Sequence, residues 1–138
     1  MTMKAAVFKL DNYIFDNINL DLSNLKPETT FNIDFIPSGK FFTDKDLYEL
    51  TFRFIANQAE SNESVVNIRC VAQFSFRDLD EDKNIPGYFY ANSIAILFPY
   101  IRAMVSTLTL LANATPMVLP TLNLSDLKDV LKEHTEKV

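Results

Sequence analysis

Glycine is scarce in this chain of 138 residues, and its scarcity excludes one class of function. Only Gly39 and Gly87 occur, so neither glycine-rich fingerprint of a nucleotide-binding protein is present. Gly39 follows Pro37-Ser38 and Gly87 follows Pro86, which predicts that both glycines are turn residues. We therefore expect no nucleotide cofactor.

Residue types that carry metal or nucleophile chemistry are equally few. Cys70 is the single cysteine, which excludes an intrachain disulfide, fits a reducing compartment and predicts a buried thiol in a strand. His134 is the single histidine, near a charged C-terminal end, and nothing at metal-ligand spacing accompanies it. No Ser-His-Asp or Cys-His set exists without it. We predict that the protein is not an enzyme, with no catalytic residues, no metal and no cofactor.

Positive charge is also in short supply. The chain has 13 Lys and Arg against 18 Asp and Glu, a net charge of -5, so no basic surface for nucleic acid is expected. The segment from Met1 to Lys9 contains no apolar run of signal-peptide length. We therefore predict a cytoplasmic protein without a nucleic-acid partner.

The first half of the chain alternates between apolar and polar residues, as half-buried strands do. The alternation covers residues 31–35, 48–54 and 66–77, and a further strand is expected between residues 3 and 22. The connections at residues 23–28, 37–45 and 57–64 are short enough for antiparallel neighbours. A four-stranded antiparallel sheet over residues 3–77 is predicted.

The second half changes to helical spacing. Apolar residues recur every three or four positions between residues 91 and 113, and a short amphipathic helix is expected over residues 124–136. Ser106 and Thr109 belong to a polar stripe that is expected to face water. Strands followed by helices predict an α+β fold, and the length fits a single domain over residues 1–138.

The long helix is too apolar to be covered by one sheet. Between Asn84 and Ser125, Arg102 is the only charged residue. A transmembrane helix is disfavoured because Arg102 lies near its middle, at a cost of about 2.5–3.5 kcal/mol, and Pro99 weakens it further. Apolar surface left in water costs ~25 cal/mol per Å², so we predict burial in a core and against a second copy, without membrane insertion.

Aromatic residues are abundant, and several fall where connections are expected. Phe residues number 12 and Tyr residues 5, without a tryptophan. An exposed apolar groove of the kind that marks a binding site is predicted from these residues on connections: Phe41, Phe42, Tyr88, Phe89, Tyr90, Met117, Val118 and Leu119.

The order of elements and one motif resemble the SecB protein-export chaperones. The family carries a similar LFPYAR start to its long helix and an asparagine-aromatic pair at the start of its second helix. Leu97-Phe98-Pro99-Tyr100, Arg102 and Asn123 match these features, and Phe74 looks like the family's phenylalanine at the end of the last strand. The similarity is strongest over residues 91–127.

The resemblance implies an ATP-independent holdase that binds unfolded polypeptides, among them preproteins for export, in hydrophobic grooves. It also implies a homotetramer, a dimer of dimers joined through the long helix. Implied residues for polypeptide binding are Leu22, Leu25, Phe31, Pro116, Met117, Leu119 and Leu122. Those for the oligomer interface are Phe98, Ile101, Val105 and Leu108.

The sequence departs from the family at two places. Ala112-Asn113 stands where the family has a glycine, and only Asp21 keeps an acidic position expected to contact the SecA motor, whereas Asn17 and Asn67 replace acids. Two alternatives therefore stay open. One is a SecB-like chaperone that stabilises the antitoxin of a toxin–antitoxin system, and the other is an oligomeric adaptor protein without chaperone activity.

Overall fold

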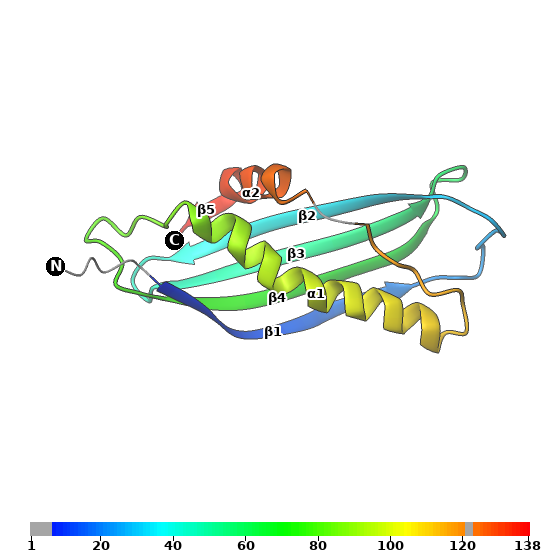
Figure 1. The fold of residues 1–138 in the computed structure, drawn as a ribbon, viewed down its shortest axis with the longest axis horizontal. Helices are drawn as coiled ribbons and strands as arrows, with labels where there is room; N and C mark the ends of the chain where they lie inside the picture. The colour runs from blue at the N-terminus through cyan, green and yellow to red at the C-terminus, as the bar shows by residue number, and fades with distance from the viewer. Residues whose placement is uncertain (1–6, 121–122) are drawn as a thin grey trace.

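The computed structural model describes residues 7–120 and 123–138, which form one curved sheet with two helices on its concave face (Figure 1). The predicted α+β fold with a long helix and a short C-terminal helix is confirmed. The elements are β1 Val7–Leu20, β2 Phe31–Phe42, β3 Leu47–Gln58, β4 Ser64–Arg77, α1 Tyr88–Leu111, α2 Leu124–Glu133 and β5 Thr135–Lys137.

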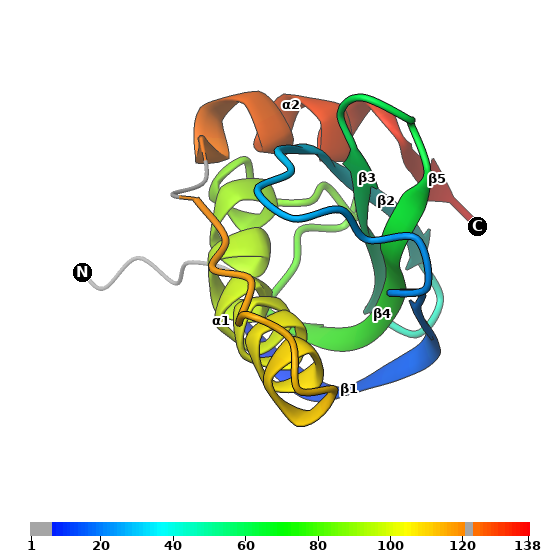
Figure 2. The same cartoon turned by 90° about the vertical axis from the view of Figure 1, so that its right-hand side faces the viewer.

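The strand order is β1-β4-β3-β2-β5, so the sheet has five strands where four were predicted. Strands β2, β3 and β4 are joined as hairpins, but β1 pairs with β4 and not with β2. The prediction that β1 and β2 are neighbours is therefore wrong. Residues 21–30 instead cross from one side of the sheet to the other, as the view along the strands shows (Figure 2).

Strand β2 continues through a segment that was predicted to be a connection. Pro37, Ser38 and Gly39 pair with β3 in unbroken register up to Phe42. Gly39 is therefore a strand residue and not a turn residue. A Cβ at this position would collide with the hydroxyl of Tyr48, so the absence of a side chain lets the buried tyrosine lie across β2.

The C-terminal residues form a strand and not a continuation of the last helix. The predicted helix over residues 124–136 ends at Glu133, and β5 pairs in parallel with Gly39–Phe41 of β2. The Thr135 hydroxyl donates to the carbonyl of Leu131 at 2.7 Å and also lies 2.7 Å from the hydroxyl of Tyr48. These two contacts fix the turn from α2 into β5.

The core lies between the concave face of the sheet and α1. Alternate side chains of β3 and β4 are buried along both strands, as the alternation predicts. Cys70 is buried among them, and burial raises the pKa of its thiol to about 12, so the predicted buried thiol is confirmed. The largest of the fully buried side chains are Tyr48, Phe41, Phe52, Phe54, Phe74 and Phe89.

Several aromatic residues predicted to line an exposed groove belong to this core. Phe41 and Phe89 are fully buried, and Tyr90 is nearly so. The ring of Phe89 lies 4.6 Å from that of Tyr48 and 4.8 Å from that of Phe76, measured between centroids. The prediction of a groove at these residues is wrong because β2 runs on to Phe42 and α1 begins at Tyr88, three residues earlier than expected.

Candidate functional site

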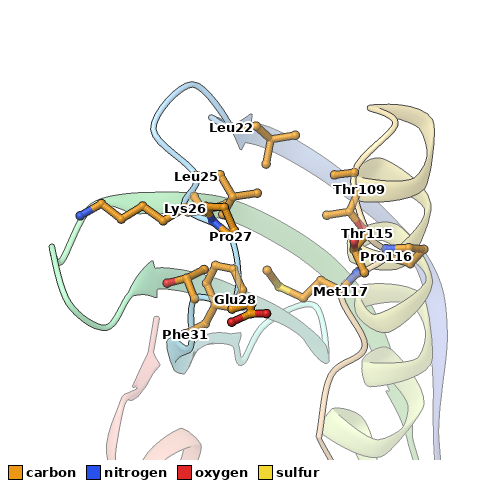
Figure 3. Close-up of a pocket in the computed structure, with 13 residues that line it drawn as sticks. Leu22, Leu25, Lys26, Pro27, Glu28, Phe31, Thr109, Thr115, Pro116 and Met117 are labelled. Atoms are coloured by element: carbon orange, nitrogen blue, oxygen red, sulfur yellow. Dashed lines mark hydrogen bonds between the residues drawn. The ribbon is translucent and has the colours of Figure 1, made fainter.

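An open cavity of about 430 Å³ lies between two loops that are far apart in the sequence (Figure 3). One wall is the crossing loop between β1 and β2, and the other is the loop that leads from α1 toward α2. Five of the seven residues predicted to bind polypeptide line this cavity: Leu22, Leu25, Phe31, Pro116 and Met117. The fold therefore brings residues 22–31 and 116–117 together at one place.

Two hydroxyl groups of α1 hold Met117 in the wall of the cavity. The Met117 amide donates to the Thr109 hydroxyl oxygen at 2.9 Å, and the Ser106 hydroxyl donates to the Met117 carbonyl at 3.0 Å. Thr109, only 2% exposed, also donates to backbone carbonyls of its own helix. The prediction that Thr109 faces water is wrong, because its hydroxyl anchors the loop.

A buried glutamine holds the opposite wall. The Gln58 side chain is 1% exposed, donates to the Asn24 carbonyl at 2.9 Å and accepts from the Lys26 amide at 3.0 Å. The amide of Ala59 donates to the Thr30 carbonyl at 2.9 Å near the end of the same loop. Gln58 was not predicted as a site residue, although a glutamine at an inward position of an alternating strand was a usable signal.

The walls of the cavity are mainly apolar, and its charges come from Lys26 and Glu28. Figure 3 shows Leu25, Phe31 and Met117 gathered around the opening between the two loops. Flexible methionine and flat aromatic surfaces adapt to apolar side chains of different shapes. The arrangement suits apolar side chains of an extended chain better than a charged metabolite.

The other two residues predicted for polypeptide binding behave differently. Leu119 is buried in the core and does not line the cavity. Leu122 lies outside the described residues. The cavity is therefore bounded on the helix side by Thr109 of α1 and by residues 114–117, the first part of the loop.

Asn113, at the position where the resemblance to the SecB family implies a glycine, has a left-handed backbone conformation. Asn113 directly follows Ala112, the C-cap residue of α1, and has a φ of 60°, in the left-handed region. Its amide donates to the Leu110 carbonyl at 3.0 Å, and the Ala114 amide donates to the Thr109 carbonyl at 3.0 Å. Asparagine tolerates this conformation better than other residues with a side chain. Asn113 therefore ends α1 in a turn that asparagine can adopt.

The residues predicted for the oligomer interface lie mostly inside the protomer. Ile101 and Val105 are fully buried against the sheet, Phe98 nearly so, and Leu108 is half-buried. The large apolar residues of α1 that are exposed are others: Tyr88, Ile96, Tyr100, Leu110 and Leu111. Tyr100 stacks on Tyr13 of β1 at 4.4 Å between ring centroids, so apolar surface continues from α1 onto the sheet.

The convex face of the sheet carries charges of both signs. Arg53 of β3 and Arg69 of β4 are paired residues in the antiparallel ladder. Arg69 forms a bidentate ion pair with Asp16 of β1, in which its Nε donates to Oδ1 at 2.8 Å and its Nη2 donates to Oδ2 at 3.0 Å. Asp21 lies just after β1, exposed, and its carboxylate accepts from the amide and hydroxyl of Ser23. These bonds lower the pKa of Asp21.

Within residues 7–120 and 123–138, no group of three or more His, Cys, Asp or Glu side chains is placed to hold a metal ion. Helix α1 is long and apolar enough to cross a membrane, a property that it shares with core helices of soluble proteins. Nine of its residues are buried within the protein.

Comparison with known proteins gives one short sequence match, and no family model matches the chain. An uncharacterized protein of Methanocaldococcus jannaschii is 48% identical over 50 residues, which cover 33% of this chain. The match spans about a third of the length of that relative, 32%.

Solved structures are similar over more of the chain. The SecB-like chaperone Rv1957 of Mycobacterium tuberculosis, in complex with a ChAD peptide from the HigA1 antitoxin, gives a TM-score of 0.69 at 18% identity. The alignment covers 84% of this chain and 91% of that chain. A protein of unknown function from Streptococcus agalactiae gives a TM-score of 0.47 at 14% identity. That alignment covers 86% of this chain and 100% of the other chain. The chain has the fold of the SecB-like chaperones.

Proposed function

We propose that this protein is a chaperone of the holdase type, which binds segments of unfolded polypeptide in the cavity between the two loops. The observation that carries the proposal is the gathering of Leu22, Leu25, Phe31 and Met117 around one open apolar cavity. The SecB-like fold supports it, because the Mycobacterium neighbour was solved with a peptide bound.

The mechanism requires no nucleotide and no catalytic residue. Apolar side chains of the client leave water when they enter the cavity, and this transfer supplies the binding free energy. Hydrogen bonds between these loops and the side chains of Thr109, Ser106 and Gln58 hold both walls before the client arrives, which lowers the entropy cost of binding. We propose that the protein acts without ATP, in the cytoplasm, and is not an enzyme.

Two client classes follow from the resemblance. The first is preproteins destined for export, delivered to SecA through a surface that includes Asp21. The second is the antitoxin of a toxin–antitoxin system, which is favoured by the antitoxin peptide in the Mycobacterium neighbour. Arg53 and Arg69 on the convex face favour the second class, since the SecA contact of the family relies on acidic residues there.

The direct test is light scattering on size-exclusion eluate, with and without an excess of reduced, carboxymethylated α-lactalbumin. Native α-lactalbumin is the control. A chaperone forms a complex of higher mass with the unfolded client and does not bind the native protein. An adaptor protein forms an oligomer but binds neither form, and that result would contradict the proposal.

The cavity is tested by Met117→Asp. A carboxylate in an apolar site costs binding free energy because it must lose its hydration, so we expect client affinity to fall at least tenfold, or about 1.4 kcal/mol. Binding is measured by fluorescence anisotropy of the labelled client. The matched control is Val118→Asp on the adjacent residue, which is 77% exposed and does not line the cavity. Equal losses in both variants would contradict the cavity assignment.

A further inference from the structure

Two arginine side chains lie side by side on the convex face of the sheet. Arg53 of β3 and Arg69 of β4 are paired residues, and like charges in this arrangement repel each other. Strand β1 supplies one counter-charge, because its register shift between Phe15 and Asn17 leaves Asp16 without a paired residue in β4. Both carboxylate oxygens of Asp16 accept from Arg69, at 2.8 and 3.0 Å. The carboxylate is therefore used on one of the two guanidinium groups.

The guanidinium group of Arg53 has no such partner. Among the described residues it makes no hydrogen bond and no ion pair. The hydrogen bond from Arg69 is the main cause of the lowered pKa of Asp16, and the charge of Arg53 adds little to it. Asp34 of β2 lies on the same face but is paired with Ile55, two residues beyond Arg53. A planar group that binds carboxylates through two hydrogen bonds is therefore free.

Exposed apolar side chains lie on both sides of the arginine pair. Ile36 of β2 is paired with Arg53 and is 46% exposed. Ile14 of β1 is 61% exposed and is paired with Val71, the next outward residue of β4 after Arg69. A free cation between apolar side chains is complementary to a carboxylate that has apolar side chains beside it.

The character of this surface favours a protein partner over other anions. On an open sheet face, a small anion would keep most of its water and bind weakly. Nucleic acid is disfavoured because the protein has a net charge of -5 and because Asp16 and Asp34 lie on the same face as the arginines. A peptide segment combines a carboxylate with apolar side chains, so it contacts Arg53 and the neighbouring isoleucines together.

We propose that the convex face binds an acidic segment of a partner protein, in which one carboxylate forms a bidentate pair with Arg53 and neighbouring apolar side chains cover Ile36 and Ile14. The cavity between the two loops lies on the concave side, next to α1, so this partner does not compete for it. The inference does not depend on the proposed chaperone function, and it gives each protomer a second binding surface for a different kind of chain.

A pair of labelled peptides tests the chemistry of the partner. One is a heptapeptide of alternating leucine and glutamate, and the other has lysine in place of glutamate. The net charge of -5 by itself favours the lysine peptide. We nevertheless expect the glutamate peptide to bind at least tenfold more tightly in fluorescence anisotropy, with an affinity that falls as sodium chloride is added. Equal affinities, or no binding of the glutamate peptide at about 1 mM, would overturn the proposal.

Substitution of Arg53 locates the site. Arg53→Gln should weaken binding of the glutamate peptide at least tenfold. The ion pair between Asp16 and Arg69 stays in place in this variant, and circular dichroism checks that the fold is retained. The matched control is Arg77→Gln, which removes the same charge from the end of β4 and should leave the affinity unchanged. Equal affinities of the two variants would overturn the assignment to Arg53.

NMR of the unaltered protein distinguishes the other possible occupants. The glutamate peptide should shift the Arg53 Nε signal and the amide signals of Ile14 and Ile36, while the Met117 amide signal stays in place. Shifts confined to Met117 would place the peptide in the cavity between the loops. An Arg53 signal that changes with protein concentration in the absence of peptide would identify a second copy of this chain as the occupant. Either of these two results would overturn the proposal.

Discussion

At the scale of single residues, packing around Gly39 decides whether β2 and β5 hold together. The Tyr48 ring fills the space that a side chain at residue 39 would need, and its hydroxyl contacts Thr135 of β5. Burial raises the pKa of Tyr48, so the phenol stays neutral and bonded. One glycine thereby permits a contact between the core and the C-terminal strand.

Gly39→Ala should therefore destabilise the protein. The added methyl group forces Tyr48 or the β2 backbone to move, and overpacking of this kind costs about 1–3 kcal/mol. Urea unfolding followed by circular dichroism measures the loss. The control is Gly87→Ala, where no atom lies within 4 Å of the added Cβ and the backbone is helical. Equal stability of the two variants would refute this account of Gly39.

The ion pair between Asp16 and Arg69 predicts a pH effect. The two hydrogen bonds from Arg69 lower the pKa of Asp16 below its ordinary value of 3.8. A carboxyl group with a lowered pKa in the folded state contributes stability above its unfolded pKa, and this contribution is lost as the pH falls through the folded pKa.

Arg69→Gln should raise the pKa of Asp16 toward 3.8. Carbon NMR of the carboxyl group, titrated from pH 6 to pH 2, reports the change. Arg77→Gln serves as the control, because Arg77 lies at the end of the same strand and is not a cause of the Asp16 shift. An unchanged titration of Asp16 in the Arg69 variant would show that the pair does not form in solution.

At the scale of elements, α2 depends on its cap at Asn123. The side-chain oxygen of Asn123 accepts from the amides of Ser125 at 3.1 Å and Asp126 at 3.4 Å, which would otherwise lack helical partners. Helix α2 in turn leads to β5, whose pairing with β2 covers part of an edge. A weak cap therefore affects an edge of the sheet as well as a helix.

Asn123→Ala should reduce the free energy of unfolding by about 0.5–2 kcal/mol, because one or two amides lose their acceptor. Thermal unfolding measures the loss. Asn123→Asp keeps an acceptor at the same place and should retain most of the stability. A loss in the aspartate variant as large as in the alanine variant would argue against capping as the cause.

At the scale of the whole molecule, the outward face of α1 predicts assembly. Leu110 and Leu111 are 61% and 78% exposed, near the end of a helix whose opposite face is already buried. Apolar surface of this kind is usually covered by a partner. We propose that a second copy covers it, as the dimer of dimers implied by the family resemblance requires.

The double substitution Leu110→Glu and Leu111→Glu should reduce the mass measured by light scattering from that of a tetramer to that of a dimer or a monomer. Four added charges at the two copies of a shared interface repel each other and must lose water. Circular dichroism checks that the variant stays folded, and Val118→Glu, a substitution at an exposed loop residue, is the control for surface charge. A double variant with unchanged mass would show that this face is not the interface.

The sequence by itself determined the fold class, most strand positions and the long helix. These features follow from local periodicity: alternation in β3 and β4 reports which side of each strand is buried, and the three- and four-residue spacing of apolar residues in α1 reports a helix. The two loops around the cavity were also identified, although through the family resemblance and not through their own composition. Leu22, Leu25, Phe31, Pro116 and Met117 accordingly lie together.

Only the tertiary structure decided which strands are neighbours, which face of α1 is buried and where β2 ends. The prediction of a turn at Pro37 and Gly39 is wrong because a strand tolerates these residues only through contacts that no local pattern shows: Pro37 lies in a strand next to the sheet edge, and Gly39 makes room for Tyr48 of the neighbouring strand. The anchoring roles of Gln58 and Thr109 likewise depend on loops that fold back onto them. Periodicity records how one element faces its surroundings, whereas pairing and anchoring depend on contacts between distant segments, which no local pattern contains.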